Sequence, residues 1–151
     1  MKLKTLLLFL AFALCSLQGS FAKTIKVLAI GNSFSEDAIE QNLYELGKAA
    51  GDEFIIGNLY IGGCPLKKHW YNAENDKGAY RYRKINADGK LVQKDNIKIS
   101  AAIAEEDWDY ISLQQASGVS GLTESYEPYL AYLVAYIKTL APGSKIVWHQ
   151  T

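Results

Sequence analysis

Three short polar segments carry the residue types that acyl-transfer chemistry requires. Gly31-Asn32-Ser33 follows one apolar run, Gly62-Gly63 follows a second, and Gln114-Gln115 close a third. A serine hydroxyl becomes an effective nucleophile when a base removes its proton and nearby donors stabilise the oxyanion. Ser33 could supply the nucleophile, while the Gly63 amide and one glutamine carboxamide could serve as oxyanion donors. The sequence therefore predicts a nucleophile with an oxyanion hole, if the fold brings the three segments together.

Each segment also has a purely structural interpretation. Ser33 could cap the helix that follows it, since a serine oxygen accepts from a free amide of the first turn. Gly62-Gly63 could only form a turn, and the two glutamines could satisfy backbone groups at the end of a strand. Neighbouring strand residues face opposite ways, so one of Gln114 and Gln115 points toward the site. The sequence leaves open which one.

The elements that must position these segments alternate along the chain. Short apolar runs rich in β-branched residues predict buried strands, over residues 24–30, 54–61, 109–115 and 145–149. Spacings of three and four between apolar residues predict helices, over residues 35–50, 97–106 and 123–140. Alternation around Asp88-Gly89 predicts a β-hairpin.

This order predicts a three-layer α/β/α, flavodoxin-like parallel sheet with helices on both faces and a β-hairpin insertion. Ligands of such folds bind beyond the carboxyl ends of the strands, where the three polar segments fall. The chain stops at Thr151, directly after the fourth strand of the parallel sheet. We therefore expect the fold to be truncated at its C-terminus, and residues 23–151 alone to associate and to lack turnover.

The three segments together resemble a known family. "GNSFS" around Ser33, "NLYIGG" ending at Gly63 and "ISLQQAS" across the glutamines are similar to successive blocks of the SGNH (GDSL-type) hydrolases. With "IGGC" and "WHQT", the set more closely resembles the SGNH-like (DUF4886-like) proteins of unknown function secreted by Bacteroides-type bacteria. The resemblance spans nearly all of the chain after the first 22 residues. It implies that Ser33 is the nucleophile and that Gly63 is an oxyanion donor.

The chain also departs from the SGNH pattern. Asn32 stands where most relatives have aspartate, and glutamines stand near the asparagine of the third block, as in some carbohydrate esterases of related fold. The family's C-terminal aspartate-histidine block has no counterpart before Thr151, so the sequence shows no clear general base. His149 ends the fourth strand of the parallel sheet on the predicted site edge and is a neighbour of the site. The family pattern gives it no catalytic role.

The remaining reactive or aromatic residues have structural alternatives. Trp70 and Tyr71, with Tyr80 and Tyr82, could stack on sugar rings or could pack the insertion onto the domain. We expect Cys64 to be a buried thiol and His69 to be structural. Two histidines without clustered cysteines or carboxylates make a poor ligand set, so we expect no metal site and no cofactor.

The first 22 residues indicate export. Lys2 and Lys4 precede an apolar run that ends in small residues at Ser20 and Ala22, as in a secretory signal peptide. The run is shorter than the roughly 20 residues of a membrane span. Leu14 is bulkier than the residue that precedes a lipoprotein cysteine, so we favour cleavage after Ala22 over lipidation at Cys15. The mature protein would be secreted or periplasmic, without a transmembrane anchor.

Removal of this segment leaves one domain, residues 23–151, with 14 basic and 16 acidic residues. This near-neutral charge gives no basic field for nucleic acid. The favoured function is a secreted serine esterase that deacylates, and specifically deacetylates, carbohydrate. The alternative is a non-catalytic carbohydrate-binding or scaffold protein. A nucleotide- or flavin-binding domain is disfavoured, because no glycine-rich phosphate loop follows the first strand.

Overall fold

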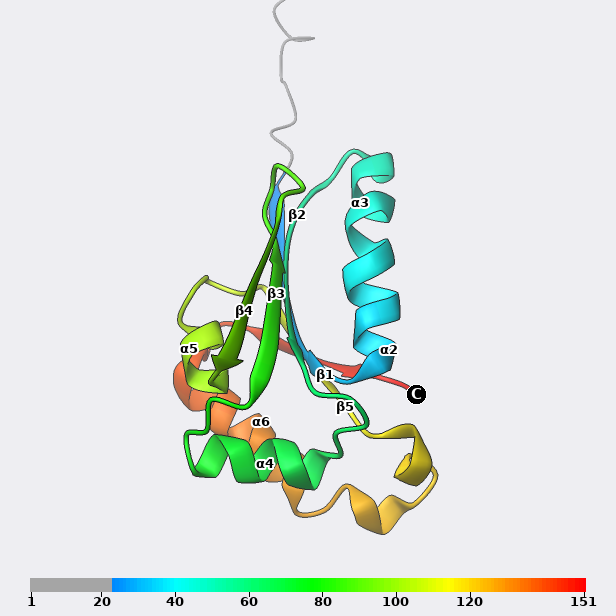
Figure 1. The fold of residues 1–151 in the computed structure, drawn as a ribbon, viewed down its shortest axis with the longest axis vertical. Helices are drawn as coiled ribbons and strands as arrows, with labels where there is room; N and C mark the ends of the chain where they lie inside the picture. The colour runs from blue at the N-terminus through cyan, green and yellow to red at the C-terminus, as the bar shows by residue number, and fades with distance from the viewer. Residues whose placement is uncertain (1–22) are drawn as a thin grey trace, which may run out of the picture.

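The computed structural model describes residues 23–151, so the expected signal peptide lies outside the described residues. A six-stranded sheet of order β4-β3-β2-β1-β5-β6 runs through the middle of the domain (Figure 1). The strands are β1 (Thr24–Gly31), β2 (Glu53–Tyr60), β3 (Tyr80–Ile85), β4 (Leu91–Ile97), β5 (Tyr110–Gln114) and β6 (Lys145–His149).

The sheet is mixed, because the predicted hairpin insertion pairs with the parallel strands and becomes part of the sheet. The strands β2, β1, β5 and β6 are parallel, as predicted. The predicted hairpin forms β3 and β4, and β3 pairs antiparallel with β2 and so extends the sheet. Burial explains this placement, because Tyr80 and Tyr82 alternate toward the core and are almost fully buried.

Helices cover both faces of the sheet and complete three layers (Figure 1). One face carries a continuous helical segment, which consists of α2 (Ser33–Ser35), the π-helical stretch η1 (Glu36–Leu43) and α3 (Tyr44–Ala50). The opposite face carries α4 (Leu66–Glu74), α5 (Ile99–Ile103) and α6 (Tyr129–Leu140). Gly51 ends α3 at a φ of 86°, a left-handed conformation that glycine adopts without strain.

Three helices differ from the sequence expectation. The predicted helix 97–106 is shortened to α5, Ile99–Ile103, because Ile97 ends β4. The predicted helix 123–140 begins only at Tyr129, after short 3-10 turns at Ser117–Val119 and Thr123–Ser125. Pro128 accounts for the late start, because proline lacks an amide donor and disfavours helical geometry at the residue before it. The helix α4 is absent from the predicted elements; its N-cap is Pro65, which makes no side-chain capping bond.

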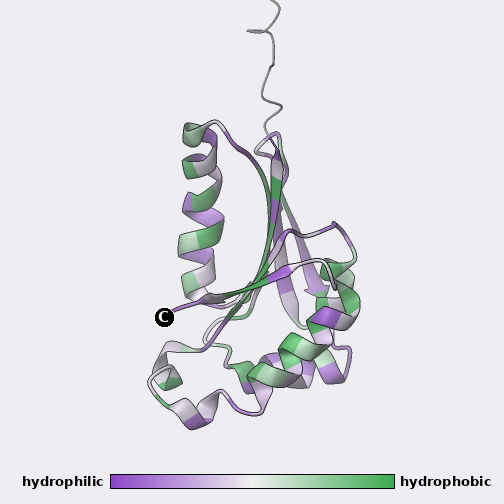
Figure 2. Ribbon diagram, turned by 180° about the vertical axis from the view of Figure 1, so that it is seen from behind, coloured by the Kyte–Doolittle hydropathy of each residue, from purple (hydrophilic) through white to green (hydrophobic). Residues whose placement is uncertain are grey.

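The apolar core lies between the sheet and the layer of α4, α5 and α6. Leu28, Ile30, Leu113, Leu133 and Ile137 are fully buried members of it. Seen from behind, the central strands are largely green, whereas the α2–α3 segment alternates between green and purple bands (Figure 2). The sheet face under α2 and η1 instead buries polar side chains, including Asn58 and Gln114. No helix within residues 23–151 is long and apolar enough to cross a membrane.

Candidate active site

The turn after β1 presents Ser33 on the surface. Asn32, which is buried, caps the following helix: its Oδ1 accepts from the Phe34 amide at 3.2 Å. Its Nδ2 donates to the Gln115 carbonyl at 3.3 Å, which joins the turn to the end of β5. Ser33 is the first helical residue and is exposed. Because Asn32 makes the capping bond, that structural role is already filled, and Ser33 stands at the amino end of the helix.

Gly31 is required by the close packing beneath this turn. A Cβ at this position would lie 2.7 Å from both Gln114 Oε1 and Ser35 Oγ. Both distances are shorter than real Cβ contacts allow, and both neighbours are buried. The glycine therefore lets the end of β1 approach the polar groups that hold the Ser33 turn.

Gln114 and Gln115 have different surroundings. The Oε1 of Gln114 accepts from the Asn32 amide at 3.0 Å, and its buried Nε2 has no hydrogen-bond partner among residues 23–151. The Oε1 of Gln115 accepts from the Leu66 amide at 3.0 Å and the Ala116 amide at 2.9 Å. Its Nε2 donates to the Ser125 carbonyl and hydroxyl. Gln115 is therefore fully engaged in structure, and Gln114 holds the free donor.

The glycine loop lies beside the Ser33 turn. The Ile61 amide donates to the Gly31 carbonyl at 3.2 Å, which ties the start of this loop to the end of β1. Gly63 is exposed at a φ of 59°, and a Cβ there would meet no atom within 4 Å. The space at the Cα of Gly63 is therefore open, which allows close approach of a ligand.

His149 reaches the same edge from β6. It pairs in register with Gln114, so the two side chains point to the same face of the sheet. Burial lowers the pKa of the half-buried His149, which favours the neutral imidazole at pH 7. Its Nδ1 is buried and has no hydrogen-bond partner among residues 23–151. His149 is thus a neutral neighbour of Gln114.

His69 and Cys64 lie in the interior. His69 is fully buried on α4, and its Nδ1 lies 2.9 Å from the Tyr80 hydroxyl. Burial lowers its pKa to about 3, so the ring is neutral. Burial also raises the pKa of the Cys64 thiol to about 12, which disfavours a reactive thiolate. These two residues have the environments of structural groups.

The four aromatic residues considered for sugar stacking divide into two pairs. Tyr80 and Tyr82 are buried and pack the hairpin onto the domain. Trp70 is half-buried, with its ring 5.1 Å from that of Tyr132. Tyr71 is 50% exposed, and its hydroxyl accepts from Lys77. Of these four, Trp70 and Tyr71 have surface available for a ligand, and both lie on α4, the helix that follows the Gly63 loop.

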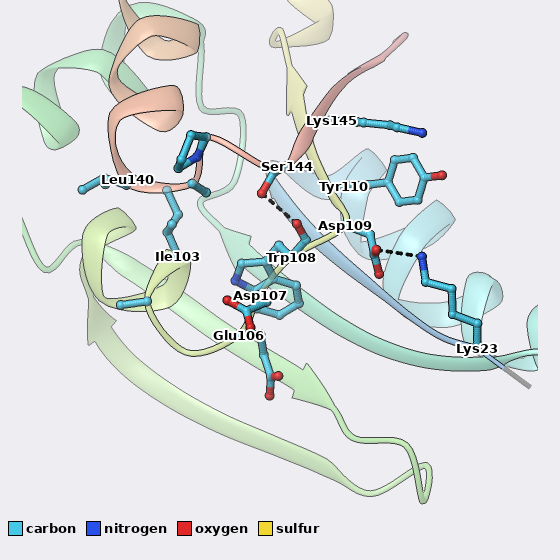
Figure 3. A pocket seen from close by; sticks show the side chains of 14 residues that line it. Lys23, Ile103, Glu106, Asp107, Trp108, Asp109, Tyr110, Leu140, Ser144 and Lys145 are labelled. Atoms are coloured by element: carbon cyan, nitrogen blue, oxygen red, sulfur yellow. Dashed lines mark hydrogen bonds and ion pairs between the residues drawn. The ribbon is translucent and has the colours of Figure 1, made fainter. Parts of the chain in front are cut away.

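A cavity of about 620 Å³ lies at the opposite edge of the sheet (Figure 3). It is lined by the residues that begin β5 and β6, including Tyr110 and Lys145, together with Lys23. Asp109 in its wall is ion-paired with Lys23, and the Ser144 hydroxyl donates to the Trp108 carbonyl (Figure 3). These groups are satisfied by one another and lie at the amino ends of the strands, away from Ser33. Within residues 23–151, no cluster of three histidine, cysteine or carboxylate residues could hold a metal ion.

Sequence reasoning missed the buried polar residues behind the turn. Asn58, Ser35 and Glu40 lie at most 7% exposed and form hydrogen bonds to one another. A signal was present, because Asn58 interrupts the apolar run of β2, and a buried amide needs a partner.

Comparison with known proteins identifies relatives of unknown function. A family described as "Domain of unknown function (DUF4886)" matches residues 26–151. The crystal structure of a DUF4886 family protein from Bacteroides uniformis ATCC 8492 is similar, with 51% sequence identity and a TM-score of 0.83. The match covers 85% of this chain and 50% of that one, so this chain spans about half the length of its solved relative. No curated protein matches. On the family match and this structural likeness, the chain belongs to the DUF4886 family.

Proposed function

We propose that the protein is a secreted serine ester hydrolase of the SGNH type that removes acyl groups, foremost acetyl, from carbohydrate. The observation that carries the proposal is the meeting of three strand ends. The Gly31 carbonyl accepts from Ile61, and Gln114 accepts from the Asn32 amide. These two bonds gather the serine turn, the glycine loop and the end of β5 at one edge of the sheet.

In the proposed reaction, the Ser33 hydroxyl attacks the ester carbonyl and the alcohol leaves. Water then hydrolyses the acyl-enzyme. The Ser33 and Gly63 amides belong to two of the segments gathered at this edge, and we assign them as the backbone donors that would stabilise the oxyanion. The Gln114 Nε2, which has no partner within the described chain, is the side-chain donor of this set. The two histidines of the described chain differ in access to this edge: His69 is enclosed in the core, whereas His149 lies beside Gln114.

A carbohydrate substrate is supported by exposed aromatic side chains on α2 and α4. Phe34, next to Ser33, is 42% exposed, and Tyr71 is exposed on α4. The apolar faces of sugar rings pack well on such side chains. Export, which the first 22 residues suggest, would bring the protein to extracellular glycans.

A non-catalytic carbohydrate-binding protein is the second candidate. It is favoured by the burial of Gln114, whose Nε2 has no exposed surface on which to meet a bound oxyanion. A binder of this kind would use the exposed aromatics and would have no need of the Ser33 hydroxyl.

The test compares Ser33→Ala with Ser117→Ala in the full-length protein. Ser117 is exposed just after β5 and makes a matched control. With p-nitrophenyl acetate, we expect Ser33→Ala to lower kcat by roughly a thousandfold or more, and Ser117→Ala to have little effect. Equal turnover by wild type and Ser33→Ala would overturn the enzyme assignment. Retained glycan binding in that case would favour the binder.

A further inference from the structure

A chain of buried polar contacts runs from β3 to the Ser33 turn. Arg83 Nη1 lies 2.6 Å from Glu40 Oε1, and Glu40 Oε2 accepts from Asn58 Nδ2 at 3.0 Å. The Ser35 hydroxyl lies 3.0 Å from Asn58 Oδ1 and 2.7 Å from the Asn32 carbonyl. This series of polar contacts therefore ends on the backbone of Asn32, the residue that precedes Ser33.

The burial of these groups is costly. Asn58 is 0% exposed, Ser35 is 1% exposed and Glu40 is 7% exposed. A buried charge or amide loses its hydration, and apolar residues of similar size often stabilise a fold as well or better. Stability alone therefore does not account for this arrangement.

The donors and acceptors fix a single arrangement of the chain. A carboxylate only accepts, so Glu40 holds the NH₂ of Asn58 toward itself and turns the Asn58 carbonyl oxygen toward Ser35. The Ser35 hydroxyl has one proton and two acceptors, Asn58 Oδ1 and the Asn32 carbonyl. Glu40 thus controls which groups surround the hydroxyl that supports the turn.

The π-helical segment η1 brings Glu40 to this position. It spans Glu36–Leu43, and Glu40 is its buried residue. Glu36, one turn earlier, also pairs with Arg83, at 3.2 Å, and with Arg81, at 2.8 Å. Unlike Glu40, Glu36 has no hydrogen bond to Asn58. π-Helical turns are frequent at functional sites.

We propose that Glu40, acting through Asn58 and Ser35, is a positioning residue that holds the turn carrying Ser33 in its reactive geometry. The inference rests on the proposed function for the role of Ser33, whereas the ordering of the turn is a separate property. A displacement of about 1 Å in a reacting group can cost on the order of a hundredfold in rate. This series of polar contacts thus links the π-helical segment and the hairpin strand β3 to the turn that carries the nucleophile.

The test swaps the carboxylate at position 40 with the amide at position 58. Asn58→Asp sets two carboxylates against each other, whereas the double variant Glu40→Gln/Asn58→Asp restores every contact. In the double variant, the new amide at position 40 donates to the new carboxylate at position 58 and accepts from Arg83. That carboxylate in turn accepts from Ser35.

In the full-length protein we expect Asn58→Asp to lower kcat by about 10- to 100-fold with KM within about twofold. The exchanged pair should regain kcat to within about threefold of wild type. Glu36→Gln, which removes a carboxylate from the same arginines, is the matched control and should leave kcat near wild type.

Hydrogen exchange of the backbone amides of residues 34–36 provides a readout independent of turnover. We expect it to accelerate in Asn58→Asp and to return to wild-type rates in the exchanged pair. The inference would be overturned if Asn58→Asp changes neither the hydrogen-exchange rates nor kcat. It would also be overturned if the double variant Glu40→Gln/Asn58→Asp stays unfolded or inactive while wild type is active. If wild type and Ser33→Ala hydrolyse esters at the same rate, Ser33 is not the nucleophile and the proposed function fails. The hydrogen-exchange rates then still decide whether this series of polar contacts orders the turn.

Discussion

Gln114 and Gln115 are neighbours at the end of β5, and they bind elements on opposite faces of the sheet. Gln114 Oε1 accepts from the Asn32 amide, and Gln115 Oε1 accepts from the Leu66 amide, both at 3.0 Å. One strand end therefore fixes both the serine turn and the first residue of α4. This division gives the two glutamines different expected phenotypes.

Gln115→Ala should act on stability. The substitution leaves the buried Leu66 amide without its acceptor and removes the bonds to Ser125, so we expect the free energy of unfolding to fall by roughly 2–4 kcal/mol. Urea denaturation followed by fluorescence measures this loss. A fall of less than about 0.5 kcal/mol would show that the carboxamide bonds are not important for stability.

Gln114 should act on turnover. Gln114→Ala is expected to lower kcat by about 10²–10³ with little change in KM, as for the loss of an oxyanion donor. Gln114→Glu keeps an oxygen for the Asn32 amide but lacks the Nε2 donor, so it should be at least as impaired. Steady-state kinetics on p-nitrophenyl acetate provide the measurement. Full activity in the glutamate variant would restrict Gln114 to holding the turn.

The sequence predicts the sheet better than the contacts between side chains. The runs that form β1, β2, β5 and β6 are recognisable because buried parallel strands are continuously apolar, a local property of sequence. The choice between Gln114 and Gln115 stays open at the level of sequence, because the face to which each points depends on the packing of helices far away in the chain. Glu40 escapes prediction for a related reason. In the sequence it resembles any other charge on an amphipathic helix, and only the π-helical segment turns it inward toward Asn58.

The pH dependence of stability should report the burial of His69. Burial lowers its pKa to about 3 from an ordinary value of 6.5, so the unfolded chain binds the proton more readily. The stability that neutral His69 contributes is fully present above pH 6.5 and is lost as the pH falls toward 3. Chemical denaturation at several pH values should show this component as a slope of about 1.4 kcal/mol per pH unit.

His69→Gln is the matched variant for this measurement, because glutamine does not titrate and can still bond the Tyr80 hydroxyl. We expect the difference in unfolding free energy between wild type and His69→Gln to vary with pH between about 4 and 6. His149→Gln, at a half-buried position, should show a smaller difference. Parallel curves for wild type and His69→Gln would contradict a neutral buried imidazole.

Cys64 should resist alkylation in the folded protein. Its thiol pKa is raised to about 12 by burial, so the thiolate fraction at pH 8 is smaller by about three orders of magnitude than for a free cysteine. Reaction with iodoacetamide, followed by mass spectrometry in buffer and in denaturant, measures the ratio of rates. Comparable rates in both conditions would mean that the thiol is accessible and ionised.

Because the hairpin forms one edge of the sheet, the two edge strands differ in how readily they pair with a further strand. Its outer strand β4 carries Lys94 and Asp95 and has an irregular register near Asn96, where φ is 58°. Charges and irregularities of this kind keep a strand from pairing with another chain. At the other border, β6 is regular and leaves Val147 and Trp148 exposed, at 41% and 39%. The edge beside β4 is thus protected against pairing with an additional strand, whereas the edge beside β6 lacks these protective features.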